Sequence, residues 1–235
     1  TCCEFSIATT TQCYDPRKGN WAIPLLEEMG IPTHIFPGIV PSGTILGQLL
    51  PSVAEDVGAG SFPVIAPACH DTACAVAAVP AEGGDFVYIS SGTWSLMGTE
   101  VSEPIINERS LAFDFTNEGG VCGTFRFLKN ITGLWLVQEC RRIWALQGED
   151  LSYDQLTWMA AQAAPFQCVV DPDYGEFLTP GDMPARIRAF CQMTNQPVPQ
   201  SKGAIIRCAL DSQAGRYVSE TKRVKEALGQ RLEPI

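Results

Sequence analysis

The sequence predicts an α/β protein, and three observations support this prediction. A short apolar run at residues 63–68 is typical of a buried strand, and the polar residues 69–72 (Cys-His-Asp-Thr) follow it directly. Small residues at 73–78 then favour a helix that packs closely against a sheet. Further strand patterns are succeeded by a run of helical patterns, which indicates an α/β or α+β domain rather than an all-helical one.

The elements before this junction are only weakly indicated. Residues 1–20 are polar and rich in turn signals, and residues 21–29 show a short amphipathic pattern that predicts a helix. The Pro- and Gly-rich residues 36–47 are expected to run extended over a surface. The chain begins at Thr1 rather than at Met, so we interpret it as a fragment of a longer protein.

After the junction, the sequence predicts a β-hairpin and then a series of helices. Residues 85–90 form one strand pattern, and residues 91–98 form a second one after a Ser/Gly/Thr tip. Asn-Glu-Gly-Gly at 117–120 is typical of a turn. Apolar residues recur near helical spacing over 127–144, which is the strongest helix pattern in the chain. The remaining helices are predicted at 153–164, 185–194 and 203–229, with a loop over 171–184.

The helix predicted over 127–144 carries two polar residues of interest. Asn130 and Gln138 are eight residues apart. On one helix they would lie within roughly 80° of each other and about 12 Å apart along the axis. They could contact a ligand in a cleft, whereas the plainer interpretation is a core helix with a solvated polar face.

Charge and composition argue against several classes of function. The formal net charge is −10, whereas a nucleic-acid partner requires a cationic surface. No stretch of about 18 apolar residues is free of charges, Pro and Gly, so we expect no membrane contact and a cytoplasmic location. The 10 cysteines include no CxxC pair and there are 2 histidines, so buried free thiols are expected rather than a zinc site.

The junction at 69–72 contains the first candidate site. A kinase that acts on an alcohol needs a carboxylate to orient the hydroxyl and to accept its proton. Asp71 lies between a predicted strand and a predicted helix, where open α/β folds place their sites, and His70 could hydrogen-bond a sugar hydroxyl. The competing interpretation is that Asp71 only caps the following helix.

The hairpin tip at 90–93 is the second candidate. Its glycine would let backbone amides approach a phosphate, and its hydroxyls, including that of Thr93, could bond to phosphate oxygens. A Ser/Gly/Thr turn can equally be a turn and nothing more. Neither GxxxxGK[ST] nor GxGxxG occurs in the chain, so a nucleotide would have to be bound by another architecture.

Together the motifs are more specific than any one of them. In order they are ATTTQ at 8–12, HDT at 70–72, SSGTWSLMG at 90–98, TNEGG at 116–120, LKNITGLWL at 128–136 and GDMP at 181–184. Over nearly its whole length the sequence resembles the L-rhamnulose-phosphorylating members of the FGGY carbohydrate kinase family. The resemblance implies an α/β, actin-like (ribonuclease H-like) sugar kinase fold of two domains, truncated at both ends, with the active site in the cleft between the domains.

The resemblance also implies a reaction and a set of site residues. The γ-phosphoryl group of ATP, with Mg²⁺, would be transferred to the 1-hydroxyl of L-rhamnulose in L-rhamnose catabolism. Asp71 resembles the proton acceptor of the family, His70 and Thr72 its sugar-contacting neighbours, Thr93 a residue that contacts ATP phosphates, Asn130 a substrate-side residue and Gln138 a nucleotide-side residue. No residue is assigned as a metal ligand.

The same resemblance sets the expected domains and the departures from the family. Residues 1–82 would end the N-terminal sugar-binding domain, and residues 83–235 would form an incomplete C-terminal nucleotide-binding domain. The Asp-x-Gly phosphate hairpin and the glycine-rich adenosine segment of the family are missing, so the fragment could be inactive by itself. The alternatives are another FGGY ketose or polyol kinase, or a non-catalytic sugar-binding fragment. Cys191 and Cys208 lie where some relatives have a paired bridge, and we expect free thiols in a reducing compartment.

Overall fold

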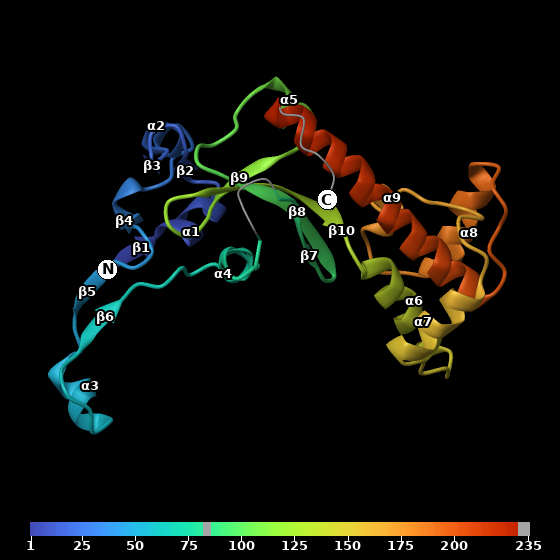
Figure 1. The fold of residues 1–235 in the computed structure, drawn as a ribbon, viewed down its shortest axis with the longest axis horizontal. Coiled ribbons are helices and arrows are strands. Elements are labelled where there is room, and N and C mark those ends of the chain that lie inside the picture. The colour runs from blue at the N-terminus through green and yellow to red at the C-terminus, as the bar shows by residue number, and fades with distance from the viewer. Residues whose placement is uncertain (82–85, 230–235) are drawn as a thin grey trace. The chain divides into compact units, whose positions relative to one another are not determined.

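The computed structural model describes residues 1–81 and 86–229 (Figure 1). It divides into two compact units. The first comprises Thr1–Tyr88 and Gly98–Leu128, and the second comprises Ile89–Met97 and Lys129–Ile235. The predicted boundary between residues 82 and 83, and the predicted start of a strand at Asp85, lie outside the described residues. Within the described residues, no helix is long and apolar enough to cross a bilayer.

The first unit begins with short elements that pair locally. They are β1 (Cys2–Glu4), α1 (Phe5–Ala8), the 3₁₀ helix η1 (Thr9–Thr11), β2 (Tyr14–Asp15), β3 (Asn20–Trp21), α2 (Ile23–Glu28), the 3₁₀ helix η2 (Thr33–Ile35) and β4 (Gly38–Val40). β1 pairs in parallel with β4, and β2 pairs antiparallel with β3. A small core of Ala8, Trp21 and Leu26 holds these elements together. The helix predicted at 21–29 is confirmed as α2.

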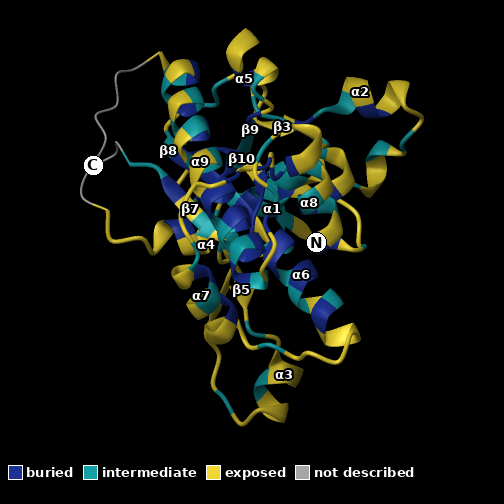
Figure 2. Ribbon diagram, turned by 90° about the vertical axis from the view of Figure 1, so that its right-hand side faces the viewer, coloured by how far each residue is buried: buried dark blue, intermediate teal, exposed yellow. Residues whose placement is uncertain are grey.

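An exposed ribbon follows, made of β5 (Ile45–Gln48), α3 (Pro51–Asp56) and β6 (Pro63–Ile65). β5 and β6 pair antiparallel, with a bulge between Ile45 and Gly47. All residues of both strands are exposed, and α3 is mainly yellow in Figure 2. The prediction of a buried strand at 63–68 was therefore wrong in its burial: β6 pairs only with β5 in a two-stranded sheet of the described residues, its residues are exposed, and Ala66 just after it is the buried residue of the run. The helix predicted after it is α4 (Asp71–Ala77).

A four-stranded sheet is built from β7 (Tyr88–Ser91), β8 (Trp94–Val101), β10 (Phe125–Thr132) and β9 (Thr116–Gly119), in that spatial order. The predicted hairpin at 85–98 is confirmed, since β7 and β8 are neighbours joined by two residues. Between β8 and β9 lies α5 (Glu108–Ala112). The turn predicted at 117–120 was wrong: residues 116–119 pair with β10, and the turn follows at Cys122 and Gly123, which both have positive φ.

Strand β10 occupies residues for which the sequence predicts a helix. Phe125–Thr132 is buried at every position except Asn130. A strand buried on both faces is apolar nearly throughout, and such a run is easily mistaken for helical spacing. On the β8 side the backbones approach closely, because a Cβ at Gly98 would lie 2.3 Å from the Phe127 carbonyl oxygen. The predicted helix over 127–144 is therefore wrong for 127–134, and the helix begins at Trp135.

In its described residues, the second unit continues with four α-helices around one core. They are α6 (Trp135–Leu146), α7 (Tyr153–Gln162), α8 (Met183–Met193) and α9 (Lys202–Leu228), with the 3₁₀ helix η3 (Gly175–Phe177) between α7 and α8. Ser152, Asp182 and Ser201 cap the N-termini of α7, α8 and α9 with their side chains. Gly229 ends α9 in the left-handed region at φ 67°. The helices predicted at 153–164, 185–194 and 203–229 are confirmed to within a few residues.

Candidate active site

The loop before α4 ends at His70, next to Asp71, and two buried polar side chains hold its backbone. Ser6 Oγ accepts hydrogen bonds from the N–H groups of Cys69 and His70, both at 3.1 Å. Glu4 Oε2 also accepts the Cys69 N–H, at 3.0 Å. Both Ser6 and Glu4 are buried, so these bonds are shielded from water. The backbone at His70 is thereby tied to β1 and α1.

Glu4 is kept ionised by the hydrogen bonds that it accepts. Ser6 Oγ donates to Oε2 at 2.5 Å, and Ser42 Oγ donates to Oε1 at 2.7 Å. Burial by itself would raise the pKa of Glu4, but these bonds, with that from the Cys69 N–H, outweigh burial and lower the pKa. At neutral pH the loop therefore rests on a buried anion.

Asp71 is the first residue of α4, and its carboxylate faces solvent. The N-cap residue is His70, which makes no side-chain capping bond, so Asp71 lies one position inside the helix. Its side chain is 96% exposed. Oδ1 accepts the Thr72 N–H at 2.6 Å and the Thr72 hydroxyl at 3.3 Å. The carboxylate keeps acceptor capacity for an incoming hydroxyl, which is what a general base requires.

The imidazole of His70 is bound by a buried arginine. Arg126 Nη2 lies 2.8 Å from His70 Nδ1 and 2.8 Å from Glu118 Oε2. Arg126 Nε donates to the Gly119 carbonyl oxygen at 3.2 Å. Arg126 is fully buried, and a buried cation is stable only when it is paired, as it is here with Glu118. On its other side, His70 Nε2 lies 3.9 Å from Asp71 Oδ1.

The hairpin tip of Gly92 and Thr93 packs on the start of α6. The Gly92 carbonyl oxygen accepts the Leu134 N–H at 2.8 Å. The Thr93 carbonyl oxygen accepts the N–H groups of Gly133 and Trp135 at 3.1 and 3.3 Å. A Cβ at Gly133 would lie 2.4 Å from the Gly92 carbonyl oxygen, so this close approach requires glycine. The tip is thus firmly supported, while Thr93 itself is exposed.

Asn130 and Gln138 lie on different elements, so their predicted placement on one helix was wrong. Asn130 is the exposed residue of β10, and Gln138 is half-buried in α6. Gly133 and Leu134 separate β10 from α6. The angle and the axial distance expected for Asn130 and Gln138 on one continuous helix therefore do not apply. Both residues belong to the second unit, as does Thr93. Their contacts with substrate or nucleotide stay predictions.

Sequence reasoning missed Arg126 and Glu4. Arg126 carried a signal, because it lies between Phe125 and Phe127 in an apolar run, and a buried cation needs a partner. Glu4 carried no such signal. It sits in a polar segment, and its partners Ser42 and Cys69 are 38 and 65 residues away along the chain.

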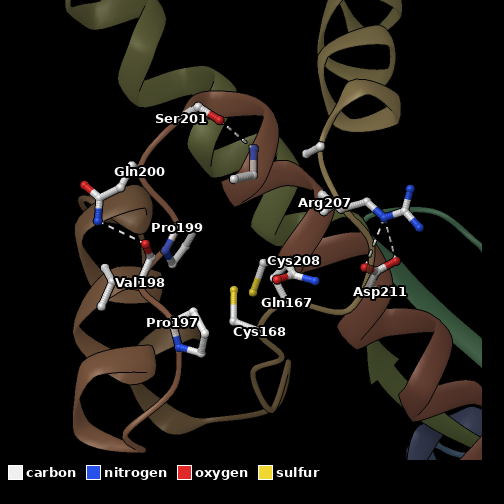
Figure 3. Close-up of a pocket in the computed structure, with 13 residues that line it drawn as sticks. Gln167, Cys168, Pro197, Val198, Pro199, Gln200, Ser201, Arg207, Cys208 and Asp211 are labelled. Carbon is white, nitrogen blue, oxygen red and sulfur yellow. Dashed lines mark hydrogen bonds and ion pairs between the residues drawn. The ribbon is translucent and has the colours of Figure 1, made fainter.

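A pocket of about 380 Å³ lies in the helical part of the second unit (Figure 3). Its wall includes Cys168 and Cys208, together with Arg207 and Asp211 of α9. Arg207 Nε lies 2.8 Å from Asp211 Oδ1, and the Phe166 N–H donates to Asp211 Oδ2 at 2.6 Å. None of the predicted site residues lines this pocket.

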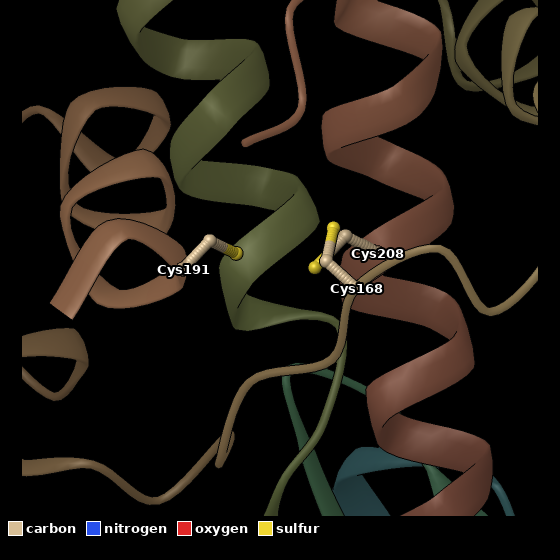
Figure 4. A group of neighbouring side chains, drawn as sticks. All are labelled: Cys168, Cys191 and Cys208. Carbon is tan, nitrogen blue, oxygen red and sulfur yellow. The ribbon is translucent and has the colours of Figure 1, made fainter. Parts of the chain in front are cut away.

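Three cysteines meet beside the pocket (Figure 4). The Sγ atoms of Cys168, Cys191 and Cys208 all lie within 4.8 Å of one another, and all three residues are buried. The sequence singled out Cys191, now in α8, and Cys208, now in α9, but it did not reveal Cys168, which lies in the loop between α7 and η3. Burial raises the pKa of Cys191 to about 11 and also raises that of Cys208, so both are protonated at neutral pH. All 10 cysteines are free thiols, and this group packs as part of the core.

Comparison with known sequences identifies relatives that match nearly the whole chain. The C-terminal domain of the FGGY family of carbohydrate kinases matches residues 87–235, and the N-terminal domain of the same family matches residues 1–78. A rhamnulokinase from Bacteroides thetaiotaomicron is 44% identical over 214 residues, which cover 91% of this chain and 43% of the relative. A rhamnulokinase from Oceanobacillus iheyensis is 40% identical over 223 residues, which cover 95% of this chain and 46% of the relative. The chain thus spans less than half the length of these curated relatives.

Solved structures share the fold. A xylulose kinase from Rhodospirillum rubrum superposes with a TM-score of 0.69 at 16% identity, over 96% of this chain and 44% of that one. A gluconate kinase from Lactobacillus acidophilus superposes with a TM-score of 0.69 at 14% identity, over 98% of this chain and 45% of that one. These likenesses confirm the predicted sugar kinase fold, and this chain corresponds to less than half of each solved chain.

Proposed function

The chain belongs to the FGGY family of carbohydrate kinases, and from this premise we propose that its parent protein phosphorylates L-rhamnulose at the 1-hydroxyl with ATP. The observation that carries the proposal is the exposed carboxylate of Asp71 beside the fixed ring of His70. The choice of sugar rests on the rhamnulokinase relatives, which are far more similar in sequence than the structural neighbours. We propose the cytoplasm, where ATP is available, as the location.

The sugar-side roles follow from the chemistry of the junction. We propose that Asp71 orients the 1-hydroxyl and accepts its proton as the bond to phosphorus forms. The exposure of its carboxylate, with one oxygen bonded to Thr72, supports this role. His70 and Thr72 would bond to other sugar oxygens, as would Asn130. Residues 1–82 would then be the sugar-binding part of the chain.

Residues 83–235 would be the nucleotide-binding part. Thr93, exposed on a tip whose backbone is held by α6, is suited to bond to the phosphates of ATP. Gln138, half-buried on α6, is the proposed contact on the nucleotide side. Mg²⁺ prefers oxygen ligands, so the three thiols near the pocket do not suit it. We therefore propose that Mg²⁺ arrives as its ATP complex, held mainly by phosphate oxygens.

The test is ATP-dependent phosphorylation of a panel of ketoses and polyols by a full-length clone. We expect L-rhamnulose to give the highest kcat/KM. A preference for xylulose or glycerol would reject the proposed substrate and leave another kinase of the family. Sugar binding without any phosphorylation, by a protein that also carries the segments upstream of Thr1, would show that the protein is not catalytic.

A further inference from the structure

We propose that Arg126 is a positioning residue that fixes the tautomer of His70, so that the ring presents an N–H group beside the Asp71 carboxylate. The inference rests on the proposed function, because it concerns how His70 binds the sugar. It adds a residue that does not touch the sugar and lies in β10, outside the 70–72 motif.

The tautomer follows from the donor inventory of the two side chains. A guanidinium has five N–H donors and no acceptor, and it stays protonated in proteins. Arg126 Nη2 lies 2.8 Å from His70 Nδ1, so Nδ1 must be the acceptor of this hydrogen bond. In a neutral imidazole the other nitrogen then carries the proton. The structure therefore assigns the proton to Nε2.

Arg126 is itself held in place, so it can impose this choice. It faces Glu118 directly across the antiparallel pair of β9 and β10, and the same Nη2 lies 2.8 Å from Glu118 Oε2. Nε is bonded to the Gly119 carbonyl oxygen, and the whole side chain is buried. Because the planar guanidinium of Arg126 is bonded at both Nε and Nη2, it has little freedom to turn away from His70.

The proton on Nε2 creates a donor next to an acceptor. Nε2 lies 3.9 Å from Asp71 Oδ1, which is too long for a good hydrogen bond, so the two groups lie side by side without bonding to each other. A 2-ketose has the complementary pair, since its 1-hydroxyl is a donor and its neighbouring carbonyl oxygen is an acceptor. Nε2–H would bond to the carbonyl oxygen while Asp71 accepts the hydroxyl. The other tautomer would place a lone pair against the carbonyl oxygen and oppose binding.

The backbone arrangement supports the same conclusion. The His70 N–H is bonded to Ser6 Oγ, and the preceding N–H is shared by Ser6 and Glu4. The main chain of His70 is thus held by Ser6, near the start of the first unit's sequence, and its ring is held by Arg126, near the end. The donor needs little reorganisation when the substrate arrives, which is the usual benefit of preorganised polar groups.

The direct test is ¹⁵N NMR of the full-length protein labelled selectively at histidine, recorded at pH 8, where an ordinary imidazole is neutral. His70→Gln identifies the signals that belong to His70. We expect a protonated Nε2 and an unprotonated Nδ1. A protonated Nδ1 overturns the inference. This readout requires no kinase activity, so it separates a failure of the inference from a failure of the proposed function.

A kinetic test uses Arg126→Lys, which retains the charge beside Glu118 but not the fixed fork of the guanidinium. We expect KM for the ketose to rise about five- to tenfold, the loss of roughly one neutral hydrogen bond, with a smaller change in kcat. The matched control is Arg17→Gln, at an exposed position of the same unit, which should leave both constants unchanged. A folded Arg126→Lys protein with native KM overturns the inference.

A second pair of variants avoids any folding defect at Arg126. The amide nitrogen of glutamine falls near the position of Nε2, whereas that of asparagine falls near Nδ1. His70→Gln should therefore keep a KM closer to native than His70→Asn does, by about fivefold or more, the value of roughly one hydrogen bond. The reverse order would show that the donor is required at Nδ1, which contradicts the assignment.

Discussion

Gly133 lies so close to Gly92 that a β-carbon at position 133 would approach the Gly92 carbonyl oxygen to 2.4 Å. Three hydrogen bonds cross this contact from the backbone of residues 133–135 to the carbonyls of Gly92 and Thr93. The glycine is thus what allows the hairpin tip to rest on the start of α6.

Gly133→Ala should separate the tip from the helix. We expect a loss of about 1–3 kcal/mol in the free energy of unfolding, from steric strain and weakened hydrogen bonds, and a raised KM for ATP. Denaturant unfolding and steady-state kinetics measure the two effects. Gly215→Ala is the control: it is in α9 with nothing within 4 Å of the added carbon and should stabilise by up to about 1 kcal/mol. Equal effects of both variants would contradict the role of the contact.

Asp71→Asn removes the proposed base with almost no change in shape. We expect kcat to fall by about 10²–10⁴ while the dissociation constant for the sugar changes little. Calorimetric binding and single-turnover phosphorylation measure the two separately. Because the side chain is 96% exposed, Tm should not change. Asp56→Asn, at an exposed position of α3, should retain full activity. Native turnover in Asp71→Asn would show that this residue only supports the helix start.

Glu4→Gln tests the buried anion under the His70 loop. The pKa of Glu4 is lowered in the folded protein, so its carboxylate contributes stability above its unfolded value of about 4.5, and this stability is lost as the pH falls through the folded pKa. We expect the variant to be less stable by about 1.5–3 kcal/mol at pH 7, the value of hydrogen bonds to a charged group. The difference from the native protein should shrink below pH 4.5. A difference that stays constant down to pH 3 would contradict the assignment.

Cys191 should make the protein sensitive to alkali. Its folded pKa of about 11 exceeds the unfolded value of about 9, so the folded state holds a proton that the unfolded chain loses. Stability contributed by the neutral thiol is complete below pH 9 and is lost as the pH rises from 9 to 11. Cys191→Ala should reduce the slope of unfolding free energy against pH by up to about 1.4 kcal/mol per unit in this range. Cys2→Ala, at an exposed position, should leave the slope as it is.

Local signals were enough for part of the fold. The helices α7 and α9 begin at serine caps and continue with apolar spacing, so both could be predicted from adjacent residues. The strand β10 could not, because its burial on both faces depends on β8 and β9, which are distant in the chain. The exposure of β6 was missed for the converse reason: an apolar run does not reveal whether a core lies beside it.

The sequence by itself determined the family, the sugar kinase fold and the candidates Asp71, His70 and Thr93, because these reside in short strings whose order can be read directly. Only the tertiary structure decided how His70 is used. Its ring nitrogen meets Arg126 across 56 residues, and its backbone meets Ser6 across 64. A tautomer depends on which donor lies within 3 Å, and the folded chain alone brings that donor into place.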